Sequence, residues 1–406
     1  MVTEPHVLIF GGGGAGLWLL DELRRRGVAA LLAESTALGA GQTIASQGIL
    51  HGGIKYTLAG MLTESANAIR NMPGLWRDAL AGRRKPDLTA TPVLAHHTHL
   101  WRTTSLKSRA GLVGARVGLR SGATRVARHD RPTALASCPG DVFRVDEPVI
   151  DTAGFLRTLA EPNRARLLHI REPRDTHFDL AGAGRVNAVR LISHDGGHAL
   201  EVRPNHVVLT SGAGNAALRR HVGLSEHAVQ RRPLHMVLVR GDLPMLYGHC
   251  VDGAATRATV TSARDADGRV VWQVGGHVAE TGVRMSEPEL IDFAHRELTA
   301  ILHDVAFRGT QWATYRIDRA EAKTPGGRRP VGATLRVDGN VITAMPTKLV
   351  LVPELARLIL NRLAGPDRPG VGPAEAADHA PPPSPWPTPA VALPPWELDR
   401  SWHQLQ

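Results

Sequence analysis

The sequence predicts an α/β fold of two intimately packed domains, one on a buried parallel sheet and one α+β domain on an antiparallel sheet. Near the start of the chain, the apolar run 6–10 leads into the glycine-rich turn 11–16, and a helical pattern (17–26) and a second apolar run (29–33) follow. Short runs of consecutive apolar residues are typical of parallel strands that are buried on both faces. Alternating apolar and polar residues at 234–240, 258–262 and 269–275 indicate the strands of the second, antiparallel sheet, whereas 207–209 is another buried run. The 406 residues also exceed one ordinary core.

The remaining elements continue these two patterns. Helices are expected at 60–82, 151–160, 286–303 and 349–363. Strands are expected at 93–101, 167–172, 188–193, 199–202, 207–209, 234–240, 258–262, 269–275 and 341–344. From about Gly365 onward Pro, Ala and Asp dominate, which is typical of an extended or disordered arm. Trp386, Trp396 and Trp402 nevertheless indicate that part of this arm packs against the folded protein.

The net charge of +10 comes from an excess of arginine that is spread along the chain. No basic run is interleaved with aromatic residues, so we expect no nucleic-acid partner. The excess leaves an anionic membrane surface and an anionic substrate open as partners, besides a simply solvated basic surface.

Cysteine usage and hydropathy indicate the compartment. The chain has no apolar segment of the roughly 20 residues that a membrane span needs, and its first strand is not preceded by a basic leader. Cys138 and Cys250 are too few for a disulfide framework or a cysteine-rich metal site. His96, His97 and His99 have no acidic or cysteine neighbour, so we expect no metal site there. The sequence therefore predicts a cytoplasmic protein, with peripheral contact at the inner face of the membrane left open.

Three glycines, Gly11, Gly13 and Gly16, match the pattern G-x-G-x-x-G between a strand and a helix. In dinucleotide-binding turns the first glycine permits the tight turn, the second lets the pyrophosphate approach, and the third lets the helix pack on the strand. The helix N-terminus then offers unpaired N–H groups to the phosphates. Glu34, eighteen residues after Gly16, is expected to accept hydrogen bonds from the adenosine ribose. The turn by itself does not choose between NAD and FAD.

The segment 39–56, GAGQTIASQGILHGGIKY, carries a resemblance that chooses between the two. It resembles the second flavin-contacting segment of the D-amino-acid-oxidase superfamily of FAD-dependent oxidoreductases. It is most similar to the flavin-dependent glycerol-3-phosphate dehydrogenases and to members like L-2-hydroxyglutarate dehydrogenase. Segments 209–215 (LTSGAGN), 312–316 (WATYR) and 346–356 (PTKLVLVPELA) match later family segments in the expected order. The resemblance implies FAD as the cofactor, bound by a Rossmann-like domain of the glutathione-reductase type.

On this resemblance the FAD-binding domain is discontinuous. It comprises 1–85, 145–230 and 325–370, the substrate domain comprises 86–144 and 231–324, and a Pro-rich tail follows at 371–406. The residues implied to contact FAD are Gly11, Gly13, Gly14, Ala15, Gly16, Glu34, Ser35, Thr43, Ser46, Gln47, Gly48, Leu50, His51, Ser211, Gly212, Thr347, Lys348 and Leu349. Two departures leave glycerol 3-phosphate itself in question: the tail is shorter than the family's extra helical domain, and Pro346-Thr347 replaces paired glycines.

The chemistry implied for the substrate depends on which atom the oxidised carbon bears. Flavin accepts a hydride from a carbon that bears oxygen or nitrogen. An alcohol also needs a base with a pKa of about 7, whereas a neutral amine needs none. His51 and His235 are the candidate bases, and His51 is also a candidate for contact with, or a covalent bond to, flavin. Arg316 is the candidate for binding a carboxylate or phosphate, since its planar fork suits two-pronged contact.

Three further residues complete the implied site. Lys55 and Tyr56 are expected to close the substrate pocket, and Lys348 is expected to stabilise negative charge on reduced flavin. The sequence thus predicts an FAD-dependent dehydrogenase or oxidase that oxidises a CH–OH group of a small anionic substrate, a 2-hydroxy acid or a polyol phosphate. An amino-acid or secondary-amine oxidase, and a catalytically inactive flavin-binding or membrane-docking protein, stay open as alternatives. Oxygen, a quinone and a carrier protein all remain candidate electron acceptors.

Overall fold

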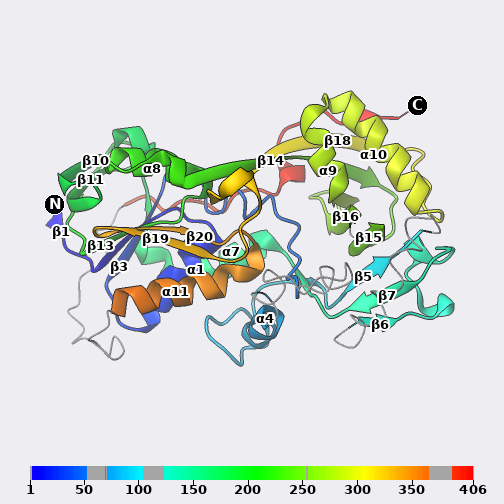
Figure 1. Ribbon diagram of the computed structural model, residues 1–406, viewed down its shortest axis with the longest axis horizontal. Helices are drawn as coiled ribbons and strands as arrows, with labels where there is room; N and C mark the ends of the chain where they lie inside the picture. Colours follow the sequence, from blue (N-terminus) through cyan, green and yellow to red (C-terminus); the bar gives the residue numbers. More distant parts are fainter. Residues whose placement is uncertain are drawn as a thin grey trace.

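The computed structural model describes residues 2–52, 69, 71–103, 123–252, 255–364 and 386–405. In these ranges the chain forms two large β-sheets, each with its own hydrophobic core, and they make the two lobes of Figure 1. The long strands β14 (Val229–Gly241) and β18 (Gln311–Ala322) pair along their length and reach from one lobe toward the other (Figure 1). Among the described residues, no helix combines the length and the apolar character that crossing a membrane requires.

The first large sheet has six strands in the order β19-β20-β13-β2-β3-β9. They are β2 (Val7–Phe10), β3 (Ala30–Glu34), β9 (Leu167–His169), β13 (His206–Leu209), β19 (Thr334–Asp338) and β20 (Val341–Met345). Neighbouring strands are parallel except β19 and β20. Because successive side chains of a strand point to opposite faces, Val7 and Ile9 pack into one core while Leu8 and Phe10 pack into another. The predicted parallel sheet, buried on both faces, is confirmed.

Helices cover one face of this sheet, and a small sheet covers the other. The core around Val7 and Ile9 is completed by α1 (Gly14–Arg25), α7 (Thr152–Ala160) and α11 (Val352–Ala364). The opposite core is completed by α8 (Asn215–His221) and by the sheet β1 (Val2–Thr3), β12 (Ala199–Val202), β11 (Arg185–Ile192) and β10 (His177–Gly182). The carboxyl ends of the parallel strands are therefore left to loops, which is where open α/β sheets bind ligands.

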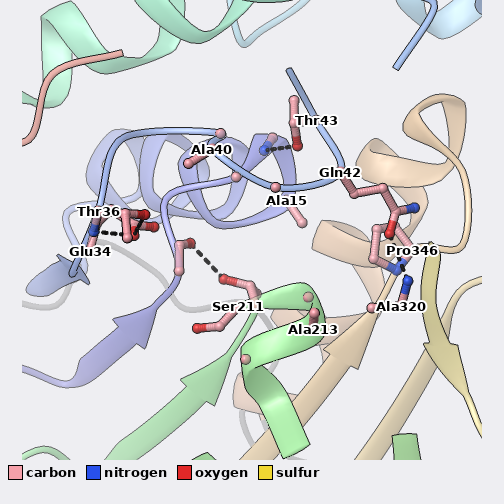
Figure 2. Close-up of a pocket in the computed structure, with 18 of the residues that line it drawn as sticks. Ala15, Glu34, Thr36, Ala40, Gln42, Thr43, Ser211, Ala213, Ala320 and Pro346 are labelled. Atoms are coloured by element: carbon pink, nitrogen blue, oxygen red, sulfur yellow. Dashed lines mark hydrogen bonds between the residues drawn. The ribbon is translucent and has the colours of Figure 1, made fainter. Parts of the chain in front are cut away.

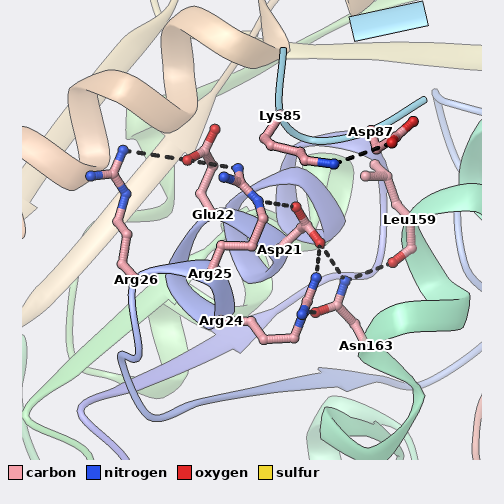
Figure 3. A network of polar contacts seen from close by, with 9 residues as sticks. All are labelled: Asp21, Glu22, Arg24, Arg25, Arg26, Lys85, Asp87, Leu159 and Asn163. Atoms are coloured by element: carbon pink, nitrogen blue, oxygen red, sulfur yellow. Dashed lines mark hydrogen bonds and ion pairs between the residues drawn. The ribbon is translucent and has the colours of Figure 1, made fainter. Parts of the chain in front are cut away.

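A network of polar side chains anchors the C-terminal half of α1 (Figure 3). Asp21 is 3% exposed and accepts hydrogen bonds from Arg24, Arg25 and Asn163 at 2.8, 2.7 and 3.3 Å. Burial raises the pKa of the Asp21 carboxyl, but the bonds from the two arginines outweigh it and hold that pKa below its ordinary value. Since Asn163 follows α7, the network ties the C-terminal half of α1 to α7.

The second large sheet has nine strands in the order β21-β18-β14-β17-β16-β15-β5-β7-β6. Its shorter members are β5 (Thr98–Trp101), β6 (Ala123–Arg125), β7 (Val142–Val145), β15 (Gly248–Asp252), β16 (Ala255–Arg264), β17 (Val270–Gly275) and β21 (His403–Gln404). It is antiparallel apart from β5 and β15. Its core is built around Trp272 and Trp312 and is covered by α10 (Glu287–Ile301), and α9 (His277–Thr281) packs against β14, β16 and β17. The predicted antiparallel sheet is confirmed.

Two expected elements differ in the structure. The single strand predicted at 93–101 is wrong, because β4 (Val93–Ala95) pairs with β8 (Val149–Ile150) while β5 joins the large sheet. The polar residues between them let the chain change sheets. Of the helix predicted at 60–82, the described part is mainly α4 (Met72–Leu80), and much of the rest lies outside the described residues.

The C-terminal arm is docked over its described part, 386–405. Trp386 Nε1 donates to the carbonyl of His169 at 3.2 Å, and Leu38 N donates to the carbonyl of Ala390 at 2.8 Å. Further on, β21 pairs with β18 (Figure 1, red). The predicted packing of the tryptophans is confirmed, and this arm crosses from one lobe to the other. The expected domain boundaries stay a prediction.

Candidate active site

A cavity of about 670 Å³ lies at the carboxyl ends of β2, β3 and β13, and we refer to it as the larger cavity (Figure 2). Its walls are mostly main chain and small side chains: the glycine turn, the loop that follows β3, and the turn that follows β13. The named lining residues in Figure 2 are Ala15, Glu34, Thr36, Ala40, Gln42, Thr43, Ser211, Ala213, Ala320 and Pro346. Gln42 reaches across to β18, where its Oε1 accepts a hydrogen bond from Ala320 N at 3.0 Å.

The glycine turn leaves no room for side chains. A Cβ on Gly16 would lie 2.0 Å from the carbonyl oxygen of Gly11, so helix α1 packs directly on the turn. Gly11 itself has φ +103°, which favours glycine. Gly14 N donates to Thr43 Oγ1 at 3.1 Å, and the first turn of α1 has no acidic residue. The first turn of α1 therefore adds no negative charge of its own to the cavity, and a helix N-terminus of this kind suits a pyrophosphate.

Glu34 stands at the carboxyl end of β3, on the rim of the larger cavity. Its Oε2 accepts a hydrogen bond from Gly12 N at 2.7 Å, and its Oε1 accepts bonds from Ser35 N and Thr36 N at 2.9 Å. The carboxylate is thus held in one orientation beside the glycine turn, and its expected contact with the ribose stays a prediction.

A second cavity of about 430 Å³, which we call the smaller cavity, adjoins the first. Both are lined by Gln42, Ser46, Ile317, Lys348 and Leu349, so the two cavities share part of their walls. Apolar side chains line part of it (Ile49, Leu234 and Met236). Its ionisable lining residues are His51, His277, Glu280, Arg319, Arg329 and Lys348.

Arg319 projects from the face of β18 that lines the smaller cavity, together with Ile317. Its side chain is 16% exposed, and its Nη1 lies 3.2 Å from Glu280 Oε1. Its Nε has no hydrogen-bond partner among the described residues. Burial, and next the charge of Arg232, lowers the pKa of this guanidinium. A further anion beside Arg319 would therefore be favoured.

His51 lines the smaller cavity, and its side chain contacts Glu147, which does not line that cavity. His51 Nδ1 lies 3.2 Å from Glu147 Oε2, and Gly52 N donates to Glu147 Oε1 at 2.5 Å. Glu147 is 2% exposed, and the ring of the fully buried His249 lies 5.3 Å from that of His51. In the described part of the chain, His51, Glu147 and His249 also bring potential metal-ligand atoms within 4.8 Å of one another.

Comparison with known proteins accounts for this arrangement. A family model described as "DAO: FAD dependent oxidoreductase" matches residues 6–357. The chain belongs to the DAO family. It is 40% identical over 402 residues to a probable FAD-dependent oxidoreductase of Pseudomonas aeruginosa, across 97% of this chain and 98% of that relative.

Solved structures agree with this assignment. The FAD-dependent oxidoreductase from Pseudomonas aeruginosa matches over 98% of both chains, with a TM-score of 0.81 and 36% identity. Glycine oxidase from Geobacillus kaustophilus (TM-score 0.62, 17% identity) and FAD-bound L-α-glycerophosphate oxidase from Mycoplasma pneumoniae (0.63, 14%) share the fold. Each of these alignments covers 89% of this chain and 95% of the other. The predicted fold class, the FAD cofactor and the oxidoreductase activity are thereby confirmed.

The larger cavity fits the FAD of a DAO-family protein. Of the residues predicted to contact FAD, those that line it are Gly11, Gly13, Gly14, Ala15, Glu34, Ser35, Thr43, Ser46, Ser211, Gly212, Lys348 and Leu349. Gln47, Gly48, His51 and Thr347 line the smaller cavity, while Gly16 and Leu50 are buried and line neither. Each residue's contact with FAD stays a prediction.

Thr347 adopts a backbone conformation that glycine would adopt more easily. It is the one non-glycine residue among the described residues with a positive φ, 61°. The turn before α11 thus keeps the left-handed conformation although Pro346-Thr347 replaces the paired glycines expected from the family. Such strain is typical of functional turns, and here it places Lys348 on the border of the two cavities.

The structure does not bring His235 and Arg316 to the smaller cavity. His235 is 3% exposed, and its ring nitrogens lie 3.0 Å from Gly282 O and 2.9 Å from Thr314 Oγ1. Arg316 donates to the carbonyls of Val283 and Met285 at 3.0 and 2.9 Å, and it lines only the larger cavity. Both lie on the strand faces opposite to the smaller cavity. Lys55 and Tyr56 lie outside the described residues.

Sequence reasoning missed Arg319, Glu147 and His249. Arg319 lies three residues after Arg316 and therefore on the other face of the same strand, and no local signal says which face meets the cavity. Glu147 and His249 approach His51 only through folding. The roles predicted for His235 and Arg316 stay predictions: Arg316 lines the larger cavity, and His235 lines neither cavity.

Proposed function

We propose that this DAO-family protein oxidises a CH–OH group of a small anionic substrate, a 2-hydroxy acid or a polyol phosphate, bound in the smaller cavity. When bound, FAD would accept the hydride from the substrate carbon. The observation that carries the proposal is the pairing, in one cavity, of arginines that can hold an anion with a histidine that can take a proton.

The arginines supply the anion site. Arg319 and Arg329 both line the smaller cavity. The ion pair of Arg319 with Glu280 leaves the Glu280 side chain 48% exposed. A substrate carboxylate or phosphate can replace such a solvent-exposed partner at low cost. Arg319 would then bind the anion in two-pronged fashion, because a guanidinium matches the geometry of either group.

His51 supplies the base. Removal of the hydroxyl proton makes hydride transfer from the same carbon easier, and a positioned imidazole contributes about 10²- to 10⁴-fold to such steps. His51 lines the cavity and lies next to the buried carboxylate of Glu147. Lys348, on the border of the two cavities, would stabilise negative charge that develops on flavin.

A second candidate is oxidation of an amino acid or secondary amine. Glu280 favours it, because a carboxylate in the smaller cavity could receive a substrate ammonium group. The similar folds include both glycine oxidase and L-α-glycerophosphate oxidase, so the fold supports either reaction. The subfamily proposed from the sequence, near glycerol-3-phosphate and L-2-hydroxyglutarate dehydrogenases, corresponds to the first candidate.

Anaerobic reduction of bound FAD tests the two candidates. The absorbance at about 450 nm would be followed while 2-hydroxy acids, polyol phosphates, amino acids and secondary amines are added in turn. Bleaching by a hydroxy compound supports the proposal, and bleaching by amines alone refutes it. Reoxidation by oxygen, a soluble quinone or a carrier protein then identifies the electron acceptor.

A further inference from the structure

We infer that Glu147 is a positioning residue that orients His51 for proton abstraction from the substrate hydroxyl. This inference rests on the proposed function. It begins from the way in which two segments, 48–52 and 147–150, lie against each other. Ile150 N donates to Gly48 O at 3.0 Å, and Leu50 N donates to Pro148 O at 2.9 Å.

The side chain of Glu147 continues this pairing past the last backbone bond. Its Oε1 accepts from Gly52 N, and its Oε2 faces His51 Nδ1. Gly48, at the other end, has φ +67°, and a Cβ there would lie 2.2 Å from Ile150 O. The close approach of segments 48–52 and 147–150 therefore depends on Gly48 at one end and on the Glu147 carboxylate at the other.

Glu147 and His51 differ in their exposure. Glu147 is 2% exposed, whereas the side chain of His51 is 20% exposed and lines the smaller cavity. Nε2 lies on the opposite edge of an imidazole ring from the Nδ1–Glu147 contact. Among the described residues, the ring of His249 packs against that of His51, tilted by 35°. His249 is in turn held by Thr259, whose Oγ1 lies 2.8 Å from His249 Nδ1. These contacts restrict rotation of His51.

This arrangement assigns the protons. A carboxylate beside Nδ1 keeps the proton on that nitrogen, so Nε2 is free of a proton and can accept one. On oxidation, Nε2 would accept the hydroxyl proton, the electrons of the O–H bond would form the C=O double bond, and bound FAD would be the acceptor of the hydride that the carbon gives up. Glu147 then lies beside the imidazolium and stabilises it, as a carboxylate does in other His–carboxylate pairs.

The test compares Glu147→Gln with Asp146→Asn, in which a neighbouring but exposed carboxylate is neutralised. With a hydroxy substrate that reduces the wild type, Glu147→Gln should slow anaerobic flavin reduction by about 10- to 100-fold. The KM and the bound FAD should not change, and Glu147→Asp should recover part of the rate. Asp146→Asn should behave as the wild type.

Two measurements separate positioning from a merely structural role. The rate of flavin reduction rises with pH as the base loses its proton, and in Glu147→Gln this rise should move to lower pH, because the imidazolium has lost its carboxylate. The other ionisable groups that line the cavity, His277, Glu280, Arg319, Arg329 and Lys348, are the same in wild type and variant. In addition, Glu147→Gln should add nothing to the defect of His51→Gln, because residues that act as one unit are not additive.

Several results would overturn the inference. An unchanged rate and pH profile in Glu147→Gln, with a hydroxy substrate that does reduce the wild type, contradicts it while leaving the proposed function intact. Additive effects of the two substitutions also contradict it. A stoichiometric divalent metal, with reduction lost on chelation and restored by Zn²⁺, would make His51, Glu147 and His249 a metal centre instead. If only amines reduce the wild type, the proposed function fails and this inference fails with it.

Discussion

The two cavities share five lining residues but differ in what else shapes them. The larger cavity is shaped by main chain, since the turns at 11–16 and 211–214 approach where a Cβ would not fit or where small residues stand. The smaller cavity is shaped by long ionisable side chains that come from separate elements, such as His51, Glu280 and Arg319. The comparison teaches that FAD binding here should be sensitive to steric change and tolerant of charge change. Substrate binding should show the reverse.

The largest effect is expected from Gly16→Ala. Its Cβ would meet the main chain of Gly11 at 2.0 Å and Thr210 Oγ1 at 2.7 Å, so α1 would be pushed off the turn that receives the pyrophosphate. We expect the purified variant to lose its FAD, seen as loss of absorbance at about 450 nm. Gly41→Ala is the matched control, because Gly41 lines the larger cavity and a Cβ there meets no protein atom within 4 Å. Full FAD content in Gly16→Ala would show that FAD binding is not sensitive to steric change at this turn.

A smaller effect, on substrate alone, is expected from Arg319→Ala. Loss of a charged hydrogen-bonding partner costs about 1.5–3 kcal/mol, which corresponds to a KM about 10- to 100-fold higher. The FAD content should not change. Arg316→Ala should change KM little, since its guanidinium is bound to the carbonyls of Val283 and Met285. Steady-state kinetics on both variants measures this. A larger increase in KM for Arg316→Ala than for Arg319→Ala would show that Arg316 binds the substrate.

The smallest effect is expected from Asp21→Asn. The Asp21 carboxylate lies in the C-terminal half of α1 and contributes to the stability of the fold. Its pKa is held below the ordinary value, so its ionised form stabilises the fold above the unfolded-state pKa of about 4, and this stability is lost as the pH falls through the folded-state pKa. Asp21→Asn should lower the free energy of unfolding by about 1–2 kcal/mol at neutral pH, and less in acid. Urea unfolding at several pH values measures this. Asp78→Asn, which removes an exposed pair with Arg83, should change stability much less. An equal loss at every pH would contradict the assigned ionisation.

Local patterns predicted those parts of the fold that local forces determine. The elements from Val7 to Glu34 were predicted with boundaries within three residues, because buried strands, a glycine turn and an amphipathic helix each leave a signature in consecutive residues. The strand expected at 93–101 was wrong because β4 and β5 join different sheets, and partner choice is not local. The left-handed conformation of Thr347 was also not predictable from local sequence, because the turn imposes it and threonine by itself does not favour it.

The sequence alone predicted a dinucleotide site at the turn 11–16, because a glycine turn between a strand and a helix is typical of such sites. With the segment at 39–56 it also indicated FAD. Tertiary structure decided which charged side chains line the smaller cavity. Arg316 and Arg319 share a strand but point to opposite faces. Which face meets the smaller cavity depends on how β18 packs beside the segment that contains Gln42. Glu147 reaches His51 only because two distant segments pair. Side-chain sites depend on such long-range contacts, whereas backbone turns depend on neighbours in the chain.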